Sequence, residues 1–238
     1  MIEFVAEAGS TNADLAARLK AGEALQEGHW LVADRQIEGK GRQGRDWVDG
    51  EGNFMGSTFI RLTRSDKNIS CLPLLAGLAV YEAVLARMAW PAQLELKWPN
   101  DVTLAGGKLA GILLERFDDT MIVGIGVNLA KAPIVPGRKI ISLGQLGPAP
   151  DRDGFARDLA RHMSEEVSRW RAQGAVSVVA RWLAVAHRPG TPLTVHAHDG
   201  QSINGTFDGL AADGALRLRL ADGSLRVIHV GDVSREGS

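Results

Sequence analysis

One stretch of the chain combines glycine with basic side chains. It runs from Gln36 to Trp47 and reads QIEGKGRQGRDW. Its glycines let the backbone approach a ligand and leave amide N–H groups unshielded, while Lys40, Arg42 and Arg45 supply the positive charge that phosphates and carboxylates need. It is not a Walker loop, because the glycine spacing and the Lys-Ser/Thr ending are missing. The stretch predicts either an anion-binding loop that orders around its ligand or a flexible basic surface loop.

A second stretch places polar groups at the end of a strand. Lys97 lies inside a strand expected over 94–98, Pro99 stops that strand, and Asn100 and Asp101 follow. Asparagine and aspartate oxygens are hard ligands of the type that hold Mg²⁺ together with nucleotide phosphates. Such a pair more often forms an Asx turn, so both interpretations stay open.

Two further strand-like segments combine small residues with a polar one. Lys108 opens the apolar run 109–114. If it points inward it must meet an anion or lose its charge, and if it points outward it is solvated. Gly124 and Gly126 share one face of a strand expected over 120–129, where they leave room for a ligand or a packed helix.

The surrounding elements predict an α+β domain followed by a small β-domain. Ser10 is the expected hydroxyl N-cap of a helix that ends at Gly22. Other strands are expected over 30–33 and 53–62, a hairpin at 105–107, and helices over 69–88, 153–173 and 176–186. Beyond residue 188, the segments 193–197, 202–207, 215–220 and 226–230 alternate with three Asp-Gly turns, which favours a small antiparallel barrel. We therefore place one domain at 1–187 and a barrel at 188–238.

Composition excludes several classes of protein. The 238 residues are 45% hydrophobic and 23% charged with a formal net charge of -1, which gives no overall electrostatic footprint for nucleic acid or an anionic membrane. The single cysteine, Cys71, excludes an intramolecular disulfide and a cysteine-rich metal site, and is expected to be a small buried hydrophobe. No signal peptide or membrane-spanning stretch is visible, so we expect a cytoplasmic protein.

A few other residues could carry chemistry but have simpler interpretations. His196 and His198 share one face of a strand, yet two histidines without a third ligand are more typical of a solvated surface than of a zinc site. Trp47 and Trp98 adjoin the motifs, where walls of a site and ordinary packing are equal alternatives.

Taken together and in this order, the four segments resemble the catalytic module of the biotin–protein ligases. The matching blocks are Ser10-Thr11-Asn12, Gln36 with 39–47, 97–101, 108–113 and 124–128. KWPND followed by KLAGI is highly specific, whereas the Ser-Thr-Asn triplet means little alone. The resemblance spans roughly the whole chain, because these enzymes also end in an SH3-like barrel. It implies a class II synthetase-like mixed sheet of the biotin/lipoate ligase type.

The resemblance also implies roles for individual positions. The positions that match biotin contacts are Ser10, Thr11, Asn12, Gln36, Gly39, Lys40, Gly41, Arg42, Lys108, Gly111 and Gly124. Those that match ATP or adenylate contacts are Arg42, Arg45, Trp47, Asn100, Lys108 and Asn128. Lys108 and Arg42 would act where the carboxylate meets the α-phosphate. Asp101 is a hypothetical base, and Asn100 and Asp101 are candidate helpers of Mg²⁺.

The implied reaction has two steps. Biotin attacks the α-phosphorus of ATP to give biotinyl-5′-AMP, and a lysine of a biotin carboxyl carrier protein domain then takes the biotin. Both steps need positioning and anion stabilisation rather than a covalent enzyme intermediate. A lipoate- or octanoyl-protein ligase is the nearest alternative, and a non-catalytic module that binds nucleic acid is a more distant one. The family includes monomers and dimers, so a homodimer stays possible on this basis.

The chain departs from the family pattern in two places. The usual loop reads GRGRRGR, and here Lys40 and Gln43 replace two arginines. Lysine keeps the charge without the planar fork, whereas Gln43 loses the charge. The ten residues before Thr11 leave no room for the helix-turn-helix repressor domain of some relatives, so DNA binding is not expected.

Overall fold

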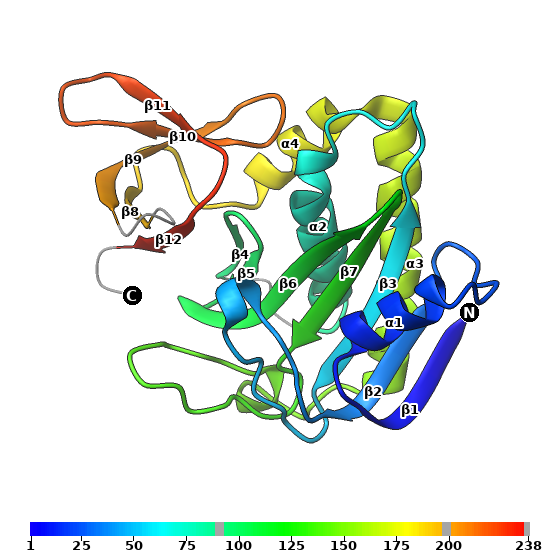
Figure 1. Cartoon of the computed structure of the whole chain (residues 1–238). Helices are drawn as coiled ribbons and strands as arrows, with labels where there is room; N and C mark the ends of the chain where they lie inside the picture. Colours follow the sequence, from blue (N-terminus) through cyan, green and yellow to red (C-terminus); the bar gives the residue numbers. More distant parts are fainter. Residues whose placement is uncertain (89–92, 197–200, 236–238) are drawn as a thin grey trace.

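A seven-stranded mixed sheet forms the larger part of the molecule (Figure 1). The computed structural model describes residues 1–88, 93–196 and 201–235. The strand order is β1-β2-β3-β7-β6-β5-β4. The strands are β1 (Ile2–Ala8), β2 (Trp30–Gln36), β3 (Phe54–Arg61), β4 (Leu94–Lys97), β5 (Asp101–Leu104), β6 (Gly107–Phe117) and β7 (Thr120–Val127). Within this sheet β1 and β2 run parallel and the other neighbours run antiparallel, so the predicted mixed sheet is confirmed.

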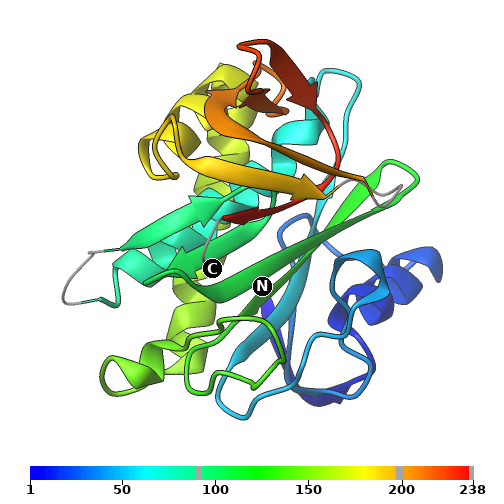
Figure 2. The ribbon, with the colours of Figure 1, turned by 90° about the vertical axis from the view of Figure 1, so that its left-hand side faces the viewer.

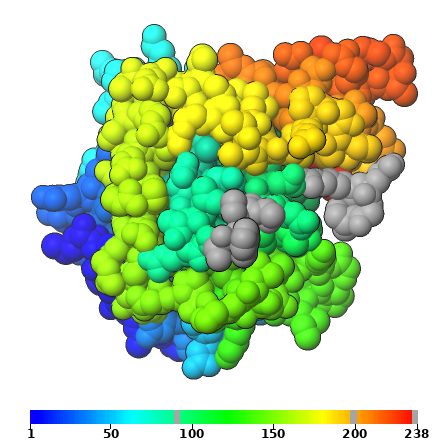
Figure 3. Space-filling view, turned by 180° about the vertical axis from the view of Figure 1, so that it is seen from behind, coloured from blue at the N-terminus to red at the C-terminus, as the bar shows by residue number. Residues whose placement is uncertain are grey.

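Helices cover both faces of this sheet. The helix α1 (Thr11–Lys20) lies on one face, whereas α2 (Leu72–Leu85) lies on the other with α3 (Arg152–Gln173) and α4 (Ala175–Ala184) packed against it (Figure 1). Side chains alternate between the faces along a strand. Phe59 accordingly packs with Leu15 of α1, while Ile60 belongs to the main core with α2. Figure 3 shows α3 along the left side of the back of the molecule and α4 at its top.

Two helix predictions need correction. The helix expected over 69–88 is a 3-10 turn at Ile69–Cys71 followed by α2, because Pro73 fits only the first turn of an α-helix, where its missing N–H is not needed. Ser10 is the N-cap residue of α1, but its hydroxyl makes no capping hydrogen bond and instead lines a cavity. Cys71 is free and fully buried, as expected.

The edge strand β1 was not predicted. It pairs with β2 on one side only, and its burial is partial because Glu3 and Glu7 lie among its apolar residues. Charged residues at the edge of a sheet protect its unpaired backbone groups from pairing with another chain, but they also weaken the strand pattern in the sequence.

The C-terminal part is a five-stranded antiparallel sheet in the order β11-β10-β9-β8-β12. Its strands are β8 (Pro192–His196), β9 (Ser202–Leu210), β10 (Leu216–Arg219), β11 (Leu225–Ile228) and β12 (Asp232–Arg235), of which β12 was not predicted. In the described residues β11 and β12 do not pair, so an antiparallel sheet is found but a closed barrel is not. Figure 2 shows this sheet stacked across the end of the larger one.

The two sheets share one hydrophobic core. Leu193, Phe207 and Leu216 of the C-terminal sheet belong to the same buried cluster as α2 and β4–β6. The indole Nε1 of Trp98 donates a 3.0 Å hydrogen bond to the carbonyl of Gly214, which fixes the KWPND segment to the second sheet. Among the helices described, none has the length and apolar character needed to cross a bilayer.

Candidate active site

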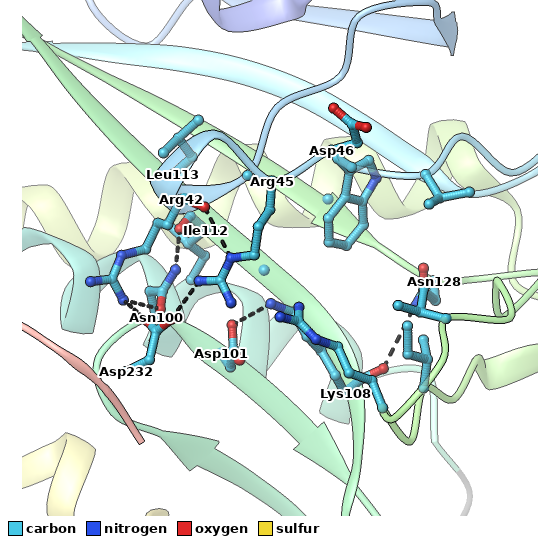
Figure 4. Close-up of a pocket in the computed structure, with 18 of the residues that line it drawn as sticks. Arg42, Arg45, Asp46, Asn100, Asp101, Lys108, Ile112, Leu113, Asn128 and Asp232 are labelled. Carbon is cyan, nitrogen blue, oxygen red and sulfur yellow. Dashed lines mark hydrogen bonds and ion pairs between the residues drawn. The ribbon is translucent and has the colours of Figure 1, made fainter. Parts of the chain in front are cut away.

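A cavity of about 880 Å³ lies where the two sheets meet the glycine-rich loop (Figure 4). Its walls come from the start of α1, loop 40–48, β6, β7, the loop 133–140, and the strands β8 and β12. Fifteen of the residues predicted for the site line it: Ser10, Thr11, Asn12, Gln36, Lys40, Gly41, Arg42, Arg45, Trp47, Asn100, Asp101, Lys108, Gly111, Gly124 and Asn128. Gly39 does not, because it acts inside the loop, where a Cβ would lie 2.8 Å from the carbonyl oxygen of Trp47.

Polar groups from α1, β2 and β3 meet at one end of the cavity. Gln36 Oε1 accepts hydrogen bonds from the backbone N–H and the hydroxyl of Thr11, at 2.7 and 3.0 Å. The hydroxyl of Ser57, which sequence reasoning missed, lies 2.7 Å from Thr11 Oγ1 and 2.6 Å from Asn12 Oδ1. Asn12 Nδ2 donates to Glu115 at 2.7 Å. These contacts fix the orientations of Thr11, Asn12 and Gln36, which line the cavity, and the fully buried Ser57 supports two of them from behind.

The two glycines of β7 make room for protein groups rather than for open space. A Cβ on Gly124 would lie 2.3 Å from Asn12 Oδ1, so Gly124 admits the first turn of α1, which was one of the two predicted alternatives. A Cβ on Gly126 would lie 2.3 Å from Cε2 of Trp47. Trp47 therefore lies flat against β7 and forms a wall of the cavity, as does the buried Trp98.

The glycine-rich loop has a defined conformation. Trp47 N–H donates to Gly39 O at 2.9 Å and Gly41 N–H donates to Arg45 O at 2.6 Å, so the loop folds back on itself as a small hairpin. Its tip uses left-handed backbone at Gln43 and Gly44, with φ of 59° and 69°. Glycine and, less easily, glutamine adopt this conformation, which accounts for the small residue at position 44.

Two arginines of this loop reach the C-terminal sheet. Arg42 Nη1 lies 3.0 Å from Asp232 Oδ1, and Arg45 Nη2 lies 2.5 Å from Asp232 Oδ2 (Figure 4). Arg42 also donates to Asn100 Oδ1 at 3.0 Å and to the carbonyl of Gly231 at 3.3 Å. Asp232 was missed because it lies almost 200 positions from its partners and no local pattern marks it. The second sheet thus contributes a carboxylate to the cavity.

Lys108 occupies the centre of the cavity. Its Nζ lies 2.6 Å from Asp101 Oδ1, with side chains that are 31% and 22% exposed. The lysine points inward and meets an anion, which is the first of the two predicted alternatives. Gly111 makes this possible, since a Cβ there would lie 3.1 Å from Lys108 Cε and Nζ.

A pair of buried asparagines supports the backbone beside Lys108. Asn128 Nδ2 donates to the carbonyls of Lys108 and Ile141 at 3.4 and 3.2 Å. Asn53 was not among the predicted site residues. Its Nδ2 lies 3.5 Å from Asn128 Oδ1, and its Oδ1 accepts hydrogen bonds from the N–H groups of Ala130 and Lys131. Both are about 1% exposed, so they fix where β7 ends and the next loop begins.

The candidate metal ligands are engaged by cations. Asn100 Oδ1 accepts from Arg42, and Asp101 Oδ1 pairs with Lys108. Across the described ranges no group of three or more His, Cys, Asp or Glu could hold a metal ion. Exposed His196 bonds Ser202 and Ser234 at 2.9 Å each, and His198 lies outside the described residues. The donor set does not fit a resident metal.

The fold and the site define a protein of two sheets whose cavity runs between a polar pocket at the start of α1 and a basic loop. Residues 10–129 match the biotin/lipoate A/B protein ligase family, and residues 194–235 match the biotin protein ligase C terminal domain. The chain belongs to the biotin/lipoate A/B protein ligase family.

Individual relatives agree with this assignment. A biotin--[acetyl-CoA-carboxylase] ligase of Paracoccus denitrificans is 38% identical over 91% of this chain and 93% of its own length. The ligase of the same name from Mycobacterium tuberculosis is 36% identical over 98% and 88%. The biotin protein ligase from Aquifex aeolicus in complex with biotin and ATP superposes with a TM-score of 0.86 at 27% identity, over 98% of each chain.

Proposed function

We propose that this chain is an ATP-dependent biotin–protein ligase. It activates biotin to biotinyl-5′-AMP and transfers the biotin to a lysine of a biotin carboxyl carrier protein domain. The observation that carries this proposal is the inward-facing Lys108, which lies with Asp101 between a fixed polar pocket and a loop that bears two arginines. The similarity to biotin--[acetyl-CoA-carboxylase] ligases along almost the whole chain supports the choice of substrates.

The polar end of the cavity suits the head group of biotin. Ser10, Thr11, Asn12 and Gln36 supply donors and acceptors there, with Gly124 beneath them. Biotin's ureido group is neutral and carries both N–H and C=O, so a fixed set of hydroxyl and amide groups can pair with each. The side chain of biotin, which ends in the carboxylate, would run under Lys40 and Gly41 toward Gly111. This path brings the carboxylate to Lys108.

ATP would enter from the other side of Lys108. Arg42, Arg45, Trp47, Asn100 and Asn128 line the cavity and would contact the nucleotide. The flat indole can stack on an adenine ring. Mg²⁺ then enters as the Mg–ATP substrate rather than as a resident ion, because Asn100 and Asp101 already face cations.

The cationic side chains that would assist catalysis are already in position before the reaction begins. As the carboxylate oxygen attacks the α-phosphorus, negative charge builds up on the phosphoryl oxygens, and Lys108 and Arg42 are positioned to stabilise it. The phosphate would draw Lys108 away from Asp101. That exchange leaves Asp101 free to accept a proton from the acceptor lysine, which must be neutral to attack.

The role of Asp101 as a base has a direct test. An Asp101→Asn variant should transfer biotin slowly from preformed biotinyl-5′-AMP. Transfer at the wild-type rate would remove Asp101 from this role.

The alternative ligand in this family is lipoate. Isothermal calorimetry with the whole chain should give tight binding for biotin and none for lipoate, since lipoate has no ureido group to pair with the α1 pocket. Tight lipoate binding without biotin binding would overturn the choice of substrate. Incubation with biotin, Mg–ATP and a carrier domain should also yield avidin-reactive product.

The two sheets belong to two domains with different roles in this proposal. We infer that residues 1–187 form the catalytic domain and 188–238 an SH3-like barrel domain that completes the site through Asp232. We also propose that the enzyme works in the cytoplasm, where carboxylases and ATP occur together, and that it is able to form a homodimer. Sedimentation with and without biotinyl-5′-AMP tests the last point.

A further inference from the structure

A carboxylate on β6 is bonded to the polar pocket at the start of α1 without lining the cavity itself. Glu115 is exposed, and its Oε2 accepts a 2.7 Å hydrogen bond from Nδ2 of the buried Asn12. Across the strands Glu115 lies opposite Ile122 of β7, which packs against α1. Residues directly opposite each other share one face of a sheet, so Glu115 also faces α1.

This contact fixes the direction of the Asn12 amide. Its Nδ2 donates to Glu115 and, at 3.5 Å, to the carbonyl of Leu113. A carboxylate and a carbonyl only accept hydrogen bonds, so both require the amide nitrogen on their side. Oδ1 of Asn12 is therefore directed the other way, where it lies 2.6 Å from the hydroxyl oxygen of Ser57.

The pocket is short of hydrogen-bond donors as a result. A chain of contacts runs from Asn12 Oδ1 through Ser57 Oγ and Thr11 Oγ1 to Gln36 Oε1, with distances of 2.6, 2.7 and 3.0 Å. Gln36 is fixed as an acceptor, because Oε1 also accepts from the backbone N–H of Thr11. Both ends of the chain only accept, and the two hydroxyls between them carry one proton each. Three contacts therefore share two protons.

Reversing the Asn12 amide would remove this shortage. Asn12 would then donate to Ser57, Ser57 to Thr11, and Thr11 to Gln36, so that every contact in the chain held a proton. The pocket would be satisfied without a ligand. That arrangement turns Oδ1 of Asn12 toward the carboxylate of Glu115, where two oxygens meet with no proton between them, so Glu115 excludes it.

We propose that Glu115 is a positioning residue that makes this pocket select ligands with N–H donors. The inference rests on the proposed ligase function, in which the ureido group of biotin enters the pocket. A ureido N–H that donates to Thr11 Oγ1 or Gln36 Oε1 supplies the donor that the chain lacks. Glu115 does not touch the ligand, but acts through Asn12 and Ser57 by holding the pocket in advance in its accepting arrangement.

The test uses Glu115→Gln, which keeps the size of the side chain and its ability to bond Asn12. Glutamine is able to accept from Nδ2 or to donate to Oδ1, so it no longer dictates the direction of the Asn12 amide. The readouts are the KM for biotin, the KM for ATP and kcat in biotin-dependent pyrophosphate release. Arg116→Gln is the matched control, because Arg116 is the next residue on β6, points to the opposite face and bonds the carbonyl of Asp118.

We expect Glu115→Gln to raise the KM for biotin by about five- to tenfold, the scale of one net hydrogen bond. The KM for ATP and kcat should stay within about twofold of wild type, since only the binding of biotin is weakened. Arg116→Gln should leave all three values unchanged. An unchanged KM for biotin in Glu115→Gln, or an equal rise in the KM for ATP, overturns the inference.

A second measurement asks whether Glu115 acts through Asn12. In an Asn12→Ala background, Glu115→Gln should have no further effect on the KM for biotin, because the amide that it orients is gone. A rise of the same size in both backgrounds overturns the proposed route. A wild-type chain that releases no pyrophosphate in response to biotin would instead overturn the proposed function on which the inference rests.

Discussion

Replacing Asp232 by asparagine should release the glycine-rich loop from the C-terminal sheet. The carboxylate of Asp232 holds Arg42 at 3.0 Å and Arg45 at 2.5 Å, and the three side chains are 25%, 21% and 37% exposed. Partly exposed ion pairs of this kind contribute about 0.5–1 kcal/mol each after solvent screening. The two together stabilise the closed loop by roughly 1–2 kcal/mol, so their loss should raise the open population by about 5- to 30-fold.

Limited trypsin digestion measures this opening directly. Lys40, Arg42 and Arg45 are cleavage sites within the loop itself. Where a loop opens and closes faster than it is cut, the cleavage rate follows its open population. Mass spectrometry of early fragments should therefore show cleavage after these residues rising by the same factor in Asp232→Asn.

The C-terminal sheet offers a matched control. Asp208 also binds two arginines, Arg217 at 2.6 Å and Arg219 at 2.5 Å, but touches no residue of the loop. Asp208→Asn should leave loop cleavage at the wild-type rate. If Asp232→Asn and Asp208→Asn are cut in the loop equally fast, the contact with Asp232 does not hold the loop and the reasoning is refuted.

Two further predictions concern packing and ionisation. Gly126→Ala places a Cβ 2.3 Å from the indole of Trp47, so the thermal unfolding midpoint should fall by the equivalent of about 1–3 kcal/mol. The control is Gly147→Ala, whose Cβ meets open space and should leave the midpoint unchanged. Equal midpoints for the two variants would contradict the packing of Trp47 on β7. Burial raises the pKa of the Cys71 thiol from 9.0 to about 12. The folded state thus holds the thiol proton more tightly than the unfolded state does. The stability that this protonated thiol contributes is present below pH 9 and is lost as the pH rises from 9 toward 12. A thiol reagent at about pH 8 should accordingly modify the urea-unfolded chain much faster than the native one, and equal rates would show that Cys71 is accessible.

The parts of the fold that sequence could predict are those with a strong local pattern. The core strands β3 and β7 are buried on both faces and therefore stand out as apolar runs, and the helix α3 follows from its helical periodicity because it buries one regular face. The edge strands β1 and β12 carry charged residues on a partly exposed backbone, so their pattern is weak. Their positions are set by pairing with strands distant in sequence, which local reasoning does not reach.

The same distinction applies to the site. Lys108 and Arg42 were found because they lie in compact blocks whose order along the chain is specific. Ser57, Asn53 and Asp232 contribute single side chains from elements that look ordinary in sequence. Asp232 lines the cavity, whereas Ser57 and Asn53 hold residues that line it, and all three take these places only through tertiary pairing. The glycines of β7 illustrate a further limit, since sequence predicts that space is needed above them but does not say that Asn12 and Trp47 fill it.

The most direct test of the central claim is biotin-dependent release of pyrophosphate from Mg–ATP. The wild-type chain should release pyrophosphate only when biotin is present, and Lys108→Ala should slow this release by at least about 100-fold, as expected when the cation at a developing phosphoryl charge is removed. Lys131→Gln should keep the wild-type rate, since Lys131 is exposed and pairs with Glu51 outside the cavity. Release that does not depend on biotin, or an equal rate for Lys108→Ala, would contradict the assignment of this cavity as the site where biotin is activated.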